Sequence, residues 1–70
     1  MDRKRVTISI PDAAGFEKAV VAAQAKGLEV EKALPKLGIV TGAIAAKDLA
    51  ALRGVPGLDS VEEERTYGPA

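Results

Sequence analysis

Two residue types that build most catalytic and metal sites are missing from this 70-residue sequence, which has no cysteine and no histidine. Without cysteine, disulfides, thiolate metal sites and cysteine nucleophiles are excluded. The absence of histidine removes the commonest general base and, with it, nearly every transition-metal site. We therefore expect no metal, no cofactor and no catalytic residue, and the protein is not predicted to be an enzyme.

Aromatic residues and net charge are also scarce. Aromatics make up 3% of the chain, and 10 basic residues balance 10 acidic ones. Nucleic-acid binders displace counterions with a net basic surface, and sheet-type RNA-binding modules stack bases on aromatic side chains. The central strands predicted below offer Thr7, Ser9, Ile39 and Thr41 instead. Nucleic acid is therefore not an expected partner.

Long apolar runs are absent too. No stretch approaches the roughly 18 apolar residues of a membrane-spanning helix. The charged residues 1–5 are followed by an alternating segment rather than by the apolar core of a signal peptide. We expect no membrane partner, no signal peptide and a cytoplasmic location.

The sequence does contain alternating and helical periodicities. Residues 6–10 alternate strictly and predict a strand with Val6, Ile8 and Ile10 inward. Residues 13–26 repeat apolar side chains at helical spacing, and Asp12 can accept from N–H groups at the start of this helix. The predicted inward side chains of that helix are Phe16, Ala19, Val20 and Ala23.

The second half continues the pattern. Gly27 stands where a helix C-terminal glycine belongs, and a second strand begins at residues 28–31. After turn residues 34–38, a third strand covers 39–45, with Val40, Gly42 and Ile44 inward. A short helix over 46–53 turns Leu49 and Leu52 inward, Leu58 covers the core, and a charged edge strand follows at 60–66.

The order of elements, βαββαβ, predicts an α+β fold of the ferredoxin-like type: a four-stranded antiparallel sheet with two helices on one face. The whole chain, residues 1–70, then forms a single domain. In this topology the first and fourth strands are neighbours, so basic residues 3–5 should lie near Glu62, Glu63 and Glu64.

One segment has a more specific pattern. Two inward leucines on a helix, Leu49 and Leu52, are followed by a turn containing Pro56 and then by Leu58; next come two spacers and Val61-Glu62-Glu63. This pattern resembles the subtilisin propeptide family, which includes free-standing proteinase inhibitors. The resemblance covers residues 38–70 well, and the first half agrees in element order.

The resemblance implies a function. Domains of this family are ferredoxin-like, and they inhibit a subtilisin-like serine protease or assist its folding. The open sheet face packs on two surface helices of the protease, and acidic residues cap those helices. By position, the caps here are Glu62, Glu63 and Glu64. The extended tail, residues 66–70, would lie in the substrate cleft as a product-like strand. Its residues are Thr66, Tyr67, Gly68, Pro69 and Ala70.

Other interpretations of the same residues stay open. A non-inhibitory interaction module could use the sheet face, around Thr7 and Thr41, to form a homodimer. The acidic run is also what a solvated strand edge looks like, and Tyr67 could pack back on its own sheet. An enzyme role would need a buried Schiff-base lysine, with Lys32 and Lys47 as examples.

Overall fold

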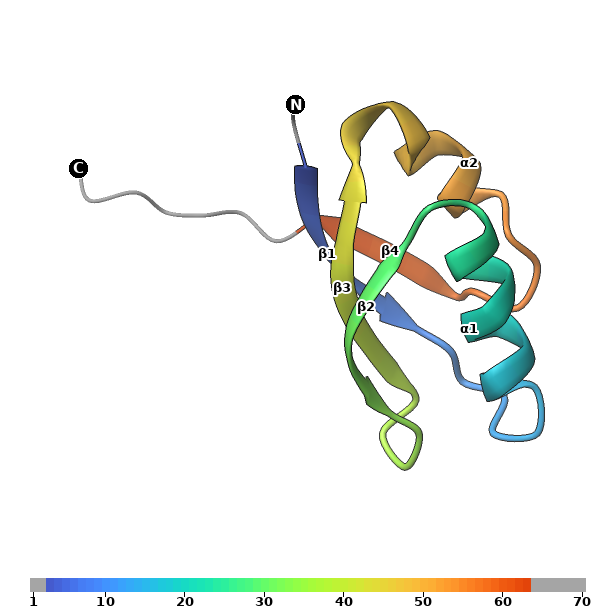
Figure 1. Cartoon of the computed structure of the whole chain (residues 1–70). Helices are drawn as coiled ribbons and strands as arrows, with labels where there is room; N and C mark the ends of the chain where they lie inside the picture. The colour runs from blue at the N-terminus through green and yellow to red at the C-terminus, as the bar shows by residue number, and fades with distance from the viewer. Residues whose placement is uncertain (1–2, 64–70) are drawn as a thin grey trace.

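The computed structural model describes residues 3–63 and forms a four-stranded antiparallel sheet with two helices on one face (Figure 1). The strands are β1 (Arg3–Ser9), β2 (Glu29–Leu34), β3 (Ile39–Ala45) and β4 (Ser60–Glu63). The helices are α1 (Phe16–Ala25) and α2 (Leu49–Arg53), the latter preceded by a 3-10 turn, η1 (Ala46–Asp48). The strand order is β2-β3-β1-β4, with β1 and β3 in the centre. This connectivity and order confirm the predicted α+β fold.

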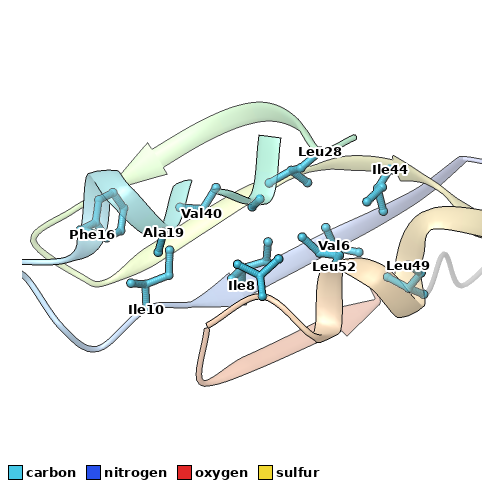
Figure 2. Close-up of a cluster of buried hydrophobic side chains, with 12 residues drawn as sticks. Val6, Ile8, Ile10, Phe16, Ala19, Leu28, Val40, Ile44, Leu49 and Leu52 are labelled. Carbon is cyan, nitrogen blue, oxygen red and sulfur yellow. The ribbon is translucent and has the colours of Figure 1, made fainter. Parts of the chain in front are cut away.

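One hydrophobic core fills the space between the sheet and the helices (Figure 2). Strand alternation supplies Val6, Ile8, Val40 and Ile44, all with no exposed surface. The helices supply Phe16, Ala19, Ala23, Leu49 and Leu52, as their periodicity predicts. Val20 and Leu58 are partly buried against this cluster, whereas Val55, which no periodicity singled out, is 5% exposed.

The first helix begins later than its pattern predicts. The Asp12 carboxylate accepts the Ala14 N–H at 3.1 Å, and the Gly15 N–H bonds to the Asp12 carbonyl at 3.2 Å. These bonds hold the backbone in a turn, so the helix starts at Phe16 with Gly15 as its N-cap. Asp12 therefore orders the approach to the helix and does not cap it, because a short polar side chain competes for nearby backbone groups.

The end of α1 follows the prediction closely. The Gly27 N–H bonds to the Gln24 carbonyl at 3.0 Å, and the Leu28 N–H bonds to the Ala23 carbonyl at 3.2 Å. These two bonds make a Schellman motif, and Gly27 has φ 107°, which favours glycine. The motif reverses the chain directly into β2 and buries Leu28, which is 4% exposed.

The β2–β3 pairing contains an irregularity. Its register runs from Glu29 opposite Ala43 and Val30 opposite Gly42 directly to Lys32 opposite Thr41, so Glu31 is an extra residue. A Cβ on Gly42 would lie 2.2 Å from the Glu29 carbonyl oxygen, and only glycine allows this close approach. Gly42 thus lies on the inward side of β3, as predicted, next to the point where β2 carries its extra residue.

Candidate docking face

The sheet has a second face that neither helix covers, and it is the candidate functional surface (Figure 1). Successive side chains on a strand point to opposite faces, so the residues between the buried ones of β1 and β3 face away from the core. Their side chains are short or medium-sized, and each is half-buried by its neighbours. They are Thr7, Ser9, Ile39, Thr41, Ala43 and Ala45.

The strand registers align these residues in rows across the sheet. One row runs from Lys32 on β2 through Thr41 and Thr7 to Glu62 on β4. The next row runs through the apolar and small residues Leu34, Ile39, Ser9 and Ser60. The open face therefore has a small polar centre, a basic residue on one edge and an acidic residue on the other.

Two ion pairs cover the far end of this face. Arg3 Nη2 lies 2.9 Å from Glu29 Oε2, and Arg5 donates through both terminal nitrogens to the two carboxylate oxygens of Glu31. Both pairs join β1 to β2 across β3, which carries Ala43 and Ala45 at that point. Short alanine side chains leave room for the arginines to reach across the intervening strand.

The Arg5–Glu31 pair also changes the acidity of its carboxyl group. Hydrogen bonds from the Arg5 guanidinium hold the pKa of Glu31 below its ordinary value, because they favour the ionised form. Desolvation opposes this effect, and the positive charges of Arg5 and Lys32 support it. The four side chains of the two ion pairs are 48–77% exposed, so water screens these attractions.

The basic residues at the start of β1 have described ion pairs on β2. We expected residues 3–5 to lie near the acidic run; Arg3 and Arg5 form ion pairs with Glu29 and Glu31, and Glu64 lies outside the described residues. The register places Glu63 opposite Val6, the residue next to Arg5, and Glu62 opposite Thr7, so β1 and β4 are neighbours as predicted. The alternation of β1 also turns both arginines toward β2 on the open face, where the bulge presents Glu31.

The predicted helix-capping residues lie on different faces of β4. Glu62 shares a row with Thr7 and belongs to the open face, whereas Glu63 shares a row with the buried Val6. Both side chains are exposed. Glu64 and the predicted tail residues Thr66, Tyr67, Gly68, Pro69 and Ala70 lie outside the described residues.

Lys32 is the residue of this surface that the sequence did not predict. Simple alternation from Glu29 puts Lys32 on the helix side, and the extra residue Glu31 turns it to the open face. Gly42 was the available signal, because a strand glycine indicates a bulge, although not its position on the partner strand.

The helix side of the molecule carries a groove. An apolar groove between α1 and the end of β2 is lined by side chains that include Phe16, Val20, Val21, Ala33 and Pro35. Val21 is 63% exposed there. The groove carries no converging polar groups beyond Glu17, and small-molecule sites need several of those.

The described surface offers few groups that could bind a metal ion or act in catalysis. Within residues 3–63, no group of three or more acidic side chains could hold a metal ion, and no polar or charged side chain is buried. Lys32 and Lys47 are exposed, whereas a Schiff-base lysine needs desolvation. No helix in this part of the chain is long and apolar enough to cross a membrane.

Comparison with known proteins finds no matching family model, no matching curated protein and no matching solved structure.

Proposed function

We propose that this protein inhibits a subtilisin-like serine protease, or assists the folding of one, in the manner of the propeptide-like inhibitors it resembles. The observation that carries the proposal is the uncovered sheet face, with Glu62 at its β4 edge. The pattern from Leu49 to Glu63 supports the same family, and a βαββαβ sheet is the fold that family uses.

The open face is suited to packing on helices. Its centre carries short side chains, Thr7, Thr41 and Ala43, so the backbone of a partner helix can approach closely. A carboxylate beside such a helix stabilises it when it lies at the N-terminal end, where free N–H groups and the dipole are positive. Glu62 is directed to this face and is the principal cap; Glu63 and Glu64 are the further candidates by position.

The C-terminal residues complete the proposed mechanism. Residues 66–70 enter the substrate cleft as an added strand, which binds through main-chain hydrogen bonds and places alternate side chains in pockets. Tyr67 and Ala70 are the side chains in the two positions where such proteases accept aromatic and small residues. Pro69 has no N–H and removes one hydrogen bond from this strand.

Titration against subtilisin with a chromogenic peptide substrate tests the proposal. We expect stoichiometric inhibition that lasts through the assay. A variant lacking residues 68–70 should lose inhibition and keep the circular dichroism spectrum of the full chain. Inhibition by the truncated chain would reject the tail mechanism, and no inhibition by the full chain would reject the function.

A further inference from the structure

We propose that the open face also binds a second copy of this chain, forming a two-fold symmetric dimer that buries the face. Two charged side chains of the face, Lys32 and Glu62, are left without an ion-pair partner among the described residues. Arg3 and Arg5 are paired with carboxylates of β2, whereas Lys32 and Glu62 form no ion pair within the part of the chain the structure describes.

Lys32 and Glu62 cannot pair within one chain. They occupy the two ends of one row and are separated by three strand spacings, about 14 Å at about 4.8 Å per strand. Both side chains are exposed and directed to the same face. The two opposite charges lie at equal distances from the centre of the sheet. A two-fold axis through that centre can therefore place each charge next to the opposite charge of a second copy.

The axis that matches them runs parallel to the strands, above the line between β3 and β1. Rotation about it exchanges the two edges of the sheet and keeps every residue at the same height along the strands. Lys32 of each copy then lies opposite Glu62 of the other, so the contact forms twice, as an isologous interface requires. Facing sheets lie about 10 Å apart, which a lysine and a glutamate together can span.

Side-chain size follows the same symmetry. In the neighbouring row the bulky Leu34 and Ile39 lie on β2 and β3, and the small Ser60 and Ser9 lie on β4 and β1. The rotation places Leu34 over Ser60 and Ile39 over Ser9 of the second copy. In the centre, Thr41 of one copy meets Thr7 of the other, and the two hydroxyls can hydrogen-bond.

At the opposite end of the face, the rotation also places large side chains over small ones. There Arg3 is paired in register with Ala45, and Arg5 with Ala43. The rotation places each arginine over an alanine of the second copy, and the glutamates of β2 keep this end neutral. Four successive rows of the face thus place large residues over small ones, or positive residues over negative ones.

The area of the open face indicates how strongly two copies can associate. Four strands about 4.8 Å apart and seven residues of about 3.4 Å rise give roughly 400 Å² per copy. This is at the small end of specific interfaces, so the dimer is expected to be weak and to form at high protein concentration. If the proposed function holds, on which this consequence depends, dimerisation withholds the inhibitory face until the protein is diluted or a protease captures the monomer.

Sedimentation equilibrium of the full chain alone, over a wide concentration range, tests the dimer. Lys32→Glu should weaken association by about tenfold, because two attractions become two repulsions. The double variant Lys32→Glu/Glu62→Lys should restore association to within about twofold of the original chain. The control Lys18→Glu makes the same charge change on α1 and should leave association unchanged.

A chain that stays monomeric at all concentrations overturns the dimer, and so does a double variant no stronger than Lys32→Glu. The protease titration is run separately at low concentration, where the chain is monomeric. Inhibition without concentration-dependent association rejects this inference alone. Association with charge-swap rescue but no inhibition supports it and rejects the protease function.

Discussion

The two faces of the sheet are built by different rules. The core against the helix-covered face consists of apolar side chains that are at most 9% exposed, and strict alternation or a helical repeat predicts most of them. The open face consists of half-buried threonine, serine, alanine and isoleucine, with charges at its edges. The covered face determines that the chain folds, and the open face is free to carry binding chemistry.

The largest effect is expected where the covered face admits no side chain at all. Gly42→Ala places a Cβ 2.2 Å from the Glu29 carbonyl oxygen, so β2 must move away from β3. We expect a loss of more than about 3 kcal/mol, which would unfold most of a domain of this size. Circular dichroism with urea denaturation measures it.

Gly54→Ala is the matched control for that change. Its Cβ would lie 3.5 Å from the Ala51 carbonyl oxygen, an ordinary contact, at a φ of −87° that alanine adopts. Its unfolding free energy should stay within about 0.5 kcal/mol of the original. Equal stability of both glycine variants would contradict the close approach at Gly42.

The second prediction compares the faces with one chemical change. Ile8→Val removes a methylene from a side chain with no exposed surface, and Ile39→Val removes the same group from the open face. We expect a cost of about 1 kcal/mol at Ile8 and less than about 0.5 kcal/mol at Ile39. The unfolding free energies of both variants are measured by urea denaturation under identical conditions. A larger cost at Ile39 would mean that the open face is part of the core.

The third prediction tests the binding chemistry of the open face. Glu62→Ala should weaken protease inhibition by about two- to thirty-fold, through the loss of a carboxylate at a helix N-terminus. Glu63→Ala should change it by less, because Glu63 is in register with Val6 on the other side of β4. Inhibition constants measured for both variants decide the order. The reverse order would reject Glu62 as the principal cap.

The sequence predicts the helix-covered face better than the open face. Periodicity alone gave the inward residues of β1, β3 and both helices, and it placed β4 at an edge. Periodicity did not predict that the Asp12 carboxylate would hydrogen-bond a nearby backbone N–H. This turn delays the start of the first helix to Phe16.

At β2 the sequence did not predict which side chains lie on the open face. The extra residue Glu31 shifts the alternation of β2, brings Lys32 to the open face and presents a carboxylate to Arg5. A bulge depends on the pairing of two strands, and no property of one strand gives its position. The ion pairs that Arg3 and Arg5 form with β2 were therefore not predicted, although the topology was correct.

The smallest effect is the pH dependence of the Arg5–Glu31 pair. The pKa of Glu31 in the folded protein lies below its value in the unfolded chain, because Arg5 donates to the ionised carboxylate. The pair's contribution to stability is therefore present above the unfolded pKa and is lost as the pH falls through the folded pKa. Since Glu31 is exposed, we expect a small contribution.

Carbon-detected NMR of the Glu31 carboxyl group should show a midpoint below 4.5, the ordinary value for this side chain. Arg5→Gln removes the charge and the two strong donors, so the Glu31 midpoint should rise toward that value. The difference in unfolding free energy between the two proteins should shrink as the pH is lowered from neutral, since protonated Glu31 no longer attracts Arg5. An unchanged midpoint in Arg5→Gln would show that the ion pair across β3 does not persist in solution.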